Sequence, residues 1–166
     1  MNSEQPWLTA TRTGGLLVDT NLLVLFAIGA VSRNRIEQFK RTRQYTKGDY
    51  DLLLRVFQQC KQLYTVAHVL AEVSNLTDLP GPERQQARQV LKETILLLNE
   101  TEMPSIRAAE HRLYKGLGLV DAAIATVAHD YNCAVLTDDL DLYLALIREN
   151  VPAFNFTHLR AAAWGN

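Results

Sequence analysis

Acidic residues within apolar stretches are the side chains of this sequence best suited to chemistry. Asp19 follows Leu-Leu-Val, Glu72 follows Val-Leu-Ala, and Asp121 stands between Leu-Val and Ala-Ala. No Lys or Arg lies within three residues of any of them. Acids are seldom buried without partners, and two carboxylates about 4 Å apart repel by roughly 4 kcal/mol at an effective dielectric near 20. A cluster of them therefore needs raised pKa values or a bound cation.

A second group of acids follows an apolar run near the C-terminus. Asp138, Asp139 and Asp141 come after residues 134–136, with Thr137 between. Carboxylate oxygens are the ligands that Mg²⁺ and Mn²⁺ prefer, so either ion suits such a cluster. Each acid also has a structural explanation, as a helix cap, as a first-turn acid that answers the helix dipole, or as a solvated surface group. The combination favours the metal site.

The elements that would position these acids alternate between strands and helices. Short apolar runs at 16–18 and 134–136 predict buried strands, 63–66 is a short β-prone run, and 152–156 predicts an edge strand. Helical spacing predicts helices over 20–30, 49–62, 67–76, 83–98, 106–115, 120–130 and 139–149. This alternation predicts an α/β fold with a parallel sheet. If the two apolar runs are neighbouring strands, Asp19 and the 138–139 pair converge at their carboxyl ends.

The overall composition is that of an ordinary globular chain. Its 166 residues and 48% hydrophobic content predict a single domain over 14–166 after a loose tail at 1–13. No apolar run approaches the roughly 20 residues of a membrane helix, and the first fifteen residues do not resemble a signal peptide. We therefore expect a cytoplasmic protein with no membrane partner. The net charge of −1 neither indicates nor excludes a nucleic-acid partner.

A basic stretch follows the first predicted helix. Phe39 and Tyr45 lie between its basic residues, so the cationic side chains would bind RNA phosphates while the aromatic rings stack on bases. The alternative is a solvated loop face without a binding role. The cations that we expect to contact RNA are Arg33, Arg35, Lys40, Arg41 and Arg43.

Four motifs resemble those of the PIN-domain ribonuclease family, which includes the VapC-type toxins. They are Val18-Asp19-Thr20-Asn21-Leu22-Leu23, Val69-Leu70-Ala71-Glu72-Val73, Gly118-Leu119-Val120-Asp121-Ala122-Ala123-Ile124-Ala125 and Val135-Leu136-Thr137-Asp138-Asp139-Leu140-Asp141. They occur in the same order as in the family, and the similarity extends from about residue 16 to residue 156. The resemblance implies a three-layer α/β/α sandwich with a central parallel sheet. It also implies RNA cleavage with Mg²⁺ or Mn²⁺, and for toxins a small antitoxin partner and a homodimer.

The resemblance also suggests roles for individual residues. The catalytic and metal-binding acids would be Asp19, Glu72, Asp121 and Asp139, with Asp141 as a further ligand. Residues that support them by hydrogen bonds would be Thr20, Asn21 and Thr137. The Thr-x-Asp form favours Asp139 over Asp138 and Asp141, although the choice among the three stays open. The number of metal ions, the RNA target and the oligomeric state also stay open.

Three rival functions would not involve nuclease activity. A non-catalytic PIN-fold module that binds RNA or serves as a scaffold would have degenerate acids, whereas all the expected acids are present here. A phosphatase would need Asp-x-Asp after its first strand, and this chain has Asp19-Thr20-Asn21. A phospho-acceptor receiver would need paired early acids and a late Lys, and neither is evident. The sequence therefore favours an active, metal-dependent endoribonuclease.

Overall fold

The central feature of the computed structural model, which describes residues 11 and 14–165, is a parallel sheet. Within these residues the strands have the order β3-β2-β1-β4-β5, and every neighbouring pair is parallel. Their bounds are β1 Leu16–Val18, β2 Leu63–Thr65, β3 Asn99–Glu100, β4 Ala134–Thr137 and β5 Ala153–Asn155. The predicted edge position of the last strand is confirmed.

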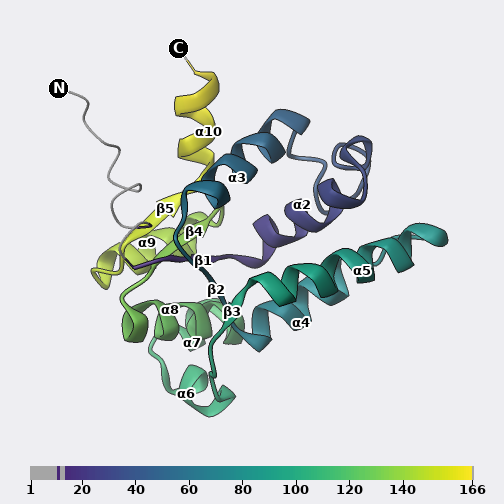
Figure 1. Cartoon of the computed structure of the whole chain (residues 1–166). Helices are drawn as coiled ribbons and strands as arrows, with labels where there is room; N and C mark the ends of the chain where they lie inside the picture. The colour runs from purple at the N-terminus through teal and green to yellow at the C-terminus, as the bar shows by residue number, and fades with distance from the viewer. Residues whose placement is uncertain (1–10, 12–13, 166) are drawn as a thin grey trace.

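Helices cover both faces of this sheet (Figure 1). The connections that lead outward from β1 through β2 to β3 contain α2 Thr20–Val31, the 3-10 turn Arg33–Arg35, α3 Lys47–Gln59, α4 Ala67–Leu76 and α5 Pro82–Leu97. The return to β4 and the step to β5 contain α6 Ser105–Glu110, α7 Tyr114–Leu117, α8 Leu119–Tyr131 and α9 Leu140–Arg148, and α10 Phe156–Trp164 follows. Because crossovers between parallel strands are right-handed, outward steps in opposite directions place their helices on opposite faces. The predicted α/β/α sandwich is confirmed.

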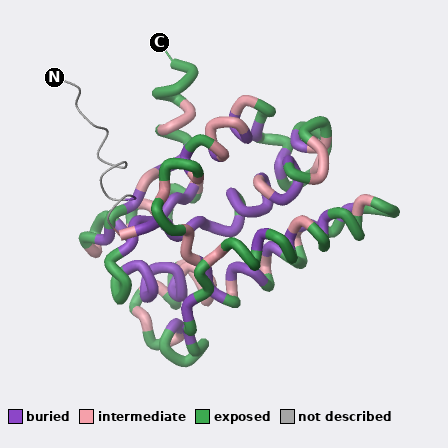
Figure 2. Tube along the Cα trace, viewed as in Figure 1, coloured by how far each residue is buried: buried purple, intermediate pink, exposed green. Residues whose placement is uncertain are grey.

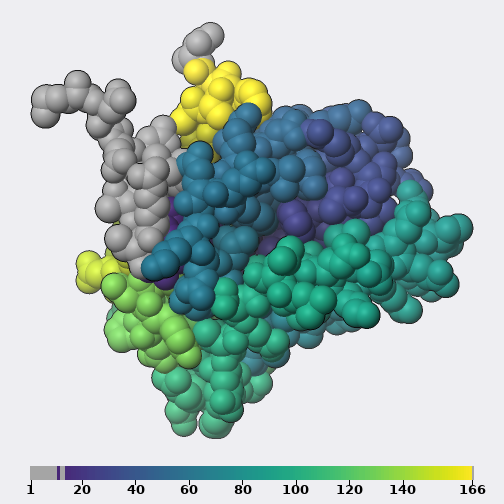
Figure 3. Space-filling model, viewed as in Figure 1, coloured from purple at the N-terminus to yellow at the C-terminus, as the bar shows by residue number. Residues whose placement is uncertain are grey.

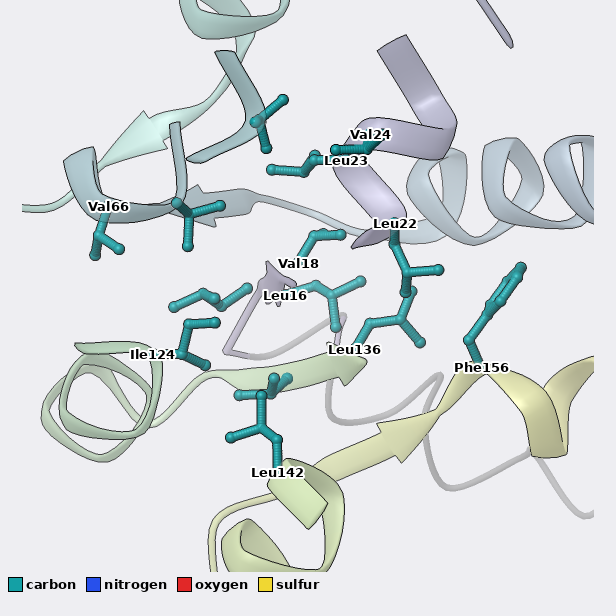
Figure 4. Close-up of a cluster of buried hydrophobic side chains, with 14 of the residues drawn as sticks. Leu16, Val18, Leu22, Leu23, Val24, Val66, Ile124, Leu136, Leu142 and Phe156 are labelled. Carbon is teal, nitrogen blue, oxygen red and sulfur yellow. The ribbon is translucent and has the colours of Figure 1, made fainter. Parts of the chain in front are cut away.

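The core is built around β1, the middle strand. Leu16, Leu17 and Val18 are each 0% exposed, as a strand covered on both faces requires. Figure 4 shows Leu136 of β4 and Ile124 of α8 among the side chains packed near it. Most residues of α2 are buried, as far along the helix as Gly29, whereas α5 exposes most of its length (Figure 2). Val18 pairs with Leu136, so β1 and β4 are neighbours and the residues after them meet at one edge of the sheet.

Three features differ from the sequence prediction. The single helix predicted over 106–115 is wrong: α6 ends at Glu110 because His111 has an extended backbone, with ψ at 139°. The two-residue strand β3 and the helix α10 were not predicted. The predicted tail at 1–13 lies, except for Thr11, outside the described residues. Among the helices that the structure describes, none is long and apolar enough to span a membrane.

Candidate active site

Asp19 lies directly after β1 and caps the N-terminus of α2. One carboxylate oxygen accepts the backbone N–H of Thr20 at 2.6 Å, and the other accepts the Thr137 hydroxyl at 2.5 Å. The side chain is only 5% exposed. The helix-cap explanation is thus correct, and it does not compete with a role in the site. The cap fixes the carboxylate at the edge where β1 and β4 end.

Three other acids reach the same place from different elements. Glu72, on α4, accepts the Thr20 hydroxyl at 2.8 Å. Asp121 lies in the first turn of α8, which begins after Gly118 at a φ of 93°, a backbone conformation that favours glycine. Asp139 caps α9 by accepting the backbone N–H of Leu142 at 3.0 Å. The N-terminal ends of α2, α8 and α9 therefore each present a carboxylate, and the helix dipoles partly stabilise the negative charge there.

All four acids line one cavity of ≈ 380 Å³. Its other lining residues are Thr20, Asn21, Leu117, Gly118, Leu119 and Val120. No described Lys, Arg or His forms an ion pair with Asp19, Glu72, Asp121 or Asp139. The cavity is therefore a concave site whose negative charge is not neutralised by the described residues.

The pKa values of Asp19 and Asp121 reflect burial together with this lack of a described cationic partner. Burial raises the pKa of Asp19 to about 7, and the charges of Asp121 and Asp138 add to that effect, although the hydrogen bonds from Thr137 and Thr20 oppose it. Burial also raises the pKa of Asp121 to about 6, with further contributions from the charges of Asp139 and Glu72. Asp19 and Asp121 thus hold protons more tightly than usual, as expected for buried carboxylates that lie near one another and have no described cationic side chain as a partner.

The donor atoms fit a hard divalent cation by their chemistry. All four acids offer oxygen ligands, which suit Mg²⁺ and Mn²⁺. Within the described part of the chain, however, no three His, Cys, Asp or Glu side chains already form a group able to hold a metal ion. Asp139 is exposed, and its Oδ2 atom accepts no hydrogen bond from a described residue. One oxygen of Asp139 therefore faces no hydrogen-bond donor of the described residues.

The other predicted acids lie outside this cavity. Asp138 points elsewhere: its carboxylate accepts hydrogen bonds from Asn21 at 3.3 Å and from the Tyr45 hydroxyl. Asp141 is exposed and lines a separate groove with Arg112 and Arg148. Of the three acids after β4, the structure therefore brings only Asp139 to the cavity with Asp19, Glu72 and Asp121.

The predicted RNA-binding cations fall into two groups. Arg33 forms an ion pair with Asp51, and Arg35 forms one with Glu83. By contrast, Lys40, Arg41 and Arg43 are exposed and make no ion pair with a described residue.

The prediction that Tyr45 could stack on bases is wrong, because its side chain is 1% exposed. Its neighbours in the sequence are mostly polar, and it packs against the distant residues Phe156 and Arg160. Phe39 is half-buried against the core. Tyr45 is thus a residue near the site whose position the sequence did not indicate.

A larger cavity, of ≈ 480 Å³, lies at the opposite end of α8. Its two arginines are already paired with acids that line it, Arg107 with Asp130 and Arg112 with Glu149. Its charge is therefore largely compensated within the cavity. The smaller, acidic cavity is the better candidate for chemistry because its charge is unbalanced.

The similarity of this chain to known proteins rests on a match to a family model. The family model described as the PIN domain matches residues 16–145, a span that contains all four acids of the cavity. A search among curated proteins finds no match.

Proposed function

This chain belongs to the PIN-domain family, and from that premise we propose that it is a Mg²⁺- or Mn²⁺-dependent endoribonuclease. Membership of this family indicates nuclease chemistry in general. The observation that supports the finer proposal is the set of four carboxylates, from four separate elements, that line one cavity and have no cationic partner among the described residues. We further propose that residues 14–166 form a single nuclease domain.

Asp19, Glu72, Asp121 and Asp139 would hold one or two ions. A divalent ion bound there supplies Lewis acidity, which makes water easier to deprotonate and stabilises negative charge on the phosphate. Asp19 provides the rigid part of the site because both of its oxygens are already hydrogen-bonded. Glu72, which accepts a hydrogen bond from Thr20, would ligate through water or orient the water that attacks the phosphodiester. Thr20 and Thr137 donate hydrogen bonds to two of these acids, Glu72 and Asp19, whereas Asn21 lines the cavity but donates to Asp138. Asp141 is a weaker candidate ligand.

RNA would bind through exposed cations of the segment between α2 and α3. Lys40, Arg41 and Arg43 are available for phosphates, whereas Arg33 and Arg35 would first have to leave their ion pairs. We retain all five as proposed contacts and expect the first three to dominate. Charge contacts of this kind are sensitive to salt.

A role as the toxin of a toxin–antitoxin pair is the biological setting that we propose for this activity. The partners would be a small antitoxin and a second copy of the chain, and the protein would act on RNA in the cytoplasm. A short gene for a DNA-binding antitoxin next to the gene for this chain would support this setting. A neighbourhood without one would count against it.

Cleavage of labelled RNA by the purified protein, with metal titrated into EDTA-treated samples, tests the proposal. We expect cleavage only with Mg²⁺ or Mn²⁺. Asp19→Asn should reduce it by more than the roughly 10- to 100-fold that loss of a supporting group costs at a metal site. A non-catalytic module would bind RNA without cutting it. Undiminished metal-dependent cleavage by folded Asp19→Asn protein would refute the assignment.

Asp139 and Asp141 form a matched pair for the same assay. Both are exposed and lie two residues apart, but only Asp139 lines the cavity. Asp139→Asn keeps an oxygen that can cap α9, so the helix should persist while cleavage is lost. Asp141→Asn should cleave nearly as well as the unmodified chain. The opposite ranking would assign the ligand to Asp141.

A further inference from the structure

Tyr45 and Asp138 form a hydrogen-bonded pair beside the acid cavity. The Tyr45 hydroxyl donates to Asp138 Oδ2, and the Asn21 side-chain amide donates to Oδ1 at 3.3 Å. No described Lys, Arg or His forms an ion pair with Asp138. Its carboxylate is therefore held by two neutral donors, which orient it without cancelling its charge.

The Tyr45 ring is itself held rigidly by the C-terminal helix. Phe156 packs edge-on against it, with the ring centroids 6.4 Å apart, and the Arg160 guanidinium lies 5.6 Å from the ring centroid. Arg160 is fixed in turn by Asp49, at 2.8 Å, and by the Gln44 carbonyl, at 3.2 Å. In Figure 3, α10 projects beside α3, and the ion pair between Arg160 and Asp49 joins these two helices. The hydroxyl therefore has little freedom to leave Asp138.

The turn after β4 is consequently anchored through Thr137 and Asp138. The Thr137 hydroxyl donates to Asp19 and accepts the backbone N–H of Asp139 at 3.0 Å. Asp138 is tied to Tyr45, and Asp139 faces the cavity. Two adjacent carboxylates thus point to different surroundings. If Asp138 were released, its unpaired charge could turn toward Asp19 and compete with Asp139.

We propose that Tyr45 is a positioning residue that holds Asp138 out of the cavity, so that Asp139 is the acid of this turn available to a divalent cation. This inference rests on the proposed function, because it concerns the same site. Tyr45 itself is too buried to touch RNA, so its effect passes through Asp138. Tyr45 would thus give Asp138 and Asp139, two adjacent acids with similar sequence surroundings, different positions relative to the cavity.

The test is the affinity for Mn²⁺ of the full chain with Tyr45→Phe, measured from the electron paramagnetic resonance signal of free Mn²⁺. This change keeps the ring and its packing and removes only the hydroxyl. The Kd should rise about 10-fold. With limiting Mn²⁺, kcat for RNA cleavage should fall by a similar factor while KM for RNA changes less than about 2-fold, because the RNA contacts are untouched.

Tyr50→Phe is the matched control. Tyr50 is also buried, stacks near Phe26 and lies under an arginine, with Arg33 5.6 Å from its ring centroid. Its hydroxyl makes no hydrogen bond with a described residue. Its Mn²⁺ affinity should equal that of the unmodified chain. An equal loss of affinity in both variants would make the effect one of general packing and would overturn the inference.

The Asp138→Asn background gives the decisive comparison. If Tyr45 acts through Asp138, adding Tyr45→Phe there should change the Mn²⁺ Kd by less than about 2-fold, since the two changes remove one interaction. If Tyr45→Phe changed the Mn²⁺ Kd as much in the Asp138→Asn background as in the unmodified chain, the inference would be overturned. An unchanged Kd in Tyr45→Phe alone would also overturn it. An unmodified chain that neither binds Mn²⁺ nor cuts RNA would instead refute the proposed function.

Discussion

Replacing Asp19 by Asn should stabilise the metal-free protein at neutral and higher pH. Burial raises the pKa of Asp19 from 3.8 to about 7, so the folded protein binds this proton more tightly than the unfolded chain does. The stabilisation from the bound proton is complete below pH 3.8, falls as the pH rises, and is gone above about pH 7. A shift of roughly three pKa units corresponds to about 4 kcal/mol, an order-of-magnitude figure. Asn cannot ionise, so the variant avoids this loss.

Urea unfolding in EDTA at pH 5 and pH 8 measures this effect. Between these two pH values the free energy of unfolding of Asp19→Asn, relative to the unmodified chain, should rise by about 2–3 kcal/mol. This difference is insensitive to the hydrogen bonds that Asn loses, because they are lost at both pH values. Saturation with Mn²⁺ should reverse the ranking, since about 2.7 kcal/mol is gained at a ligand concentration 100 times Kd. A relative stability that does not change with pH would refute the reasoning.

Asp49→Asn is the control for this measurement. Asp49 is 1% exposed, and burial alone would raise its pKa, but hydrogen bonds from Arg160 and Thr46 outweigh burial and lower it. The same substitution there removes charge-assisted hydrogen bonds, each typically worth about 1.5–3 kcal/mol. It should therefore destabilise the protein at pH 8. Stabilisation of both variants would mean that the two buried aspartates do not differ as described.

Three further predictions concern RNA binding, metal binding and packing. Arg41→Ala combined with Arg43→Ala should weaken RNA binding and reduce the logarithmic salt slope by about 1.4, measured by fluorescence anisotropy; an unchanged slope would remove them from the interface. Mn²⁺ affinity, measured calorimetrically, should increase up to about pH 7 and then level off, because Asp19 must lose its proton to bind metal; a pH-independent affinity would argue against Asp19 as a ligand. Gly29→Ala should cost about 1–3 kcal/mol in urea unfolding, because a methyl group there would overlap the Tyr50 ring; a neutral result would contradict that packing.

The convergence of acids was predictable because it depends on strand topology. Asp19 and Asp139 each stand just beyond an apolar run, and parallel strands bring such positions to one edge when the runs are neighbours. The pairing of Val18 with Leu136 confirms that they are. Asp121 could be placed at the start of a helix because Gly118 marks the turn before it. Local patterns were sufficient here because each pattern fixes the position of one side chain.

Features that depend on contacts between distant segments could not be predicted in this way. Tyr45 stands in a polar, basic segment, and its burial comes from Phe156 and Arg160 more than a hundred residues away. The helix that carries them, α10, did have a local signal, since Asn155 caps it by accepting the Thr157 backbone N–H at 2.9 Å. Strand β3 had none, because Asn-Glu is a poor β-former and pairs only through its register with β2.

The most direct test of the central claim follows Mn²⁺ binding and RNA cleavage together as Mn²⁺ is titrated into one EDTA-treated sample. If the acid cavity both binds Mn²⁺ and cleaves RNA, the binding and cleavage curves should rise with the same midpoint in the unmodified chain. Asp121→Asn should lose Mn²⁺ binding and RNA cleavage while retaining its fold. Asp121 suits this test because it lines the cavity and accepts no hydrogen bond from a described residue. Cleavage that persists in excess EDTA, or that is undiminished in folded Asp121→Asn, would contradict the claim.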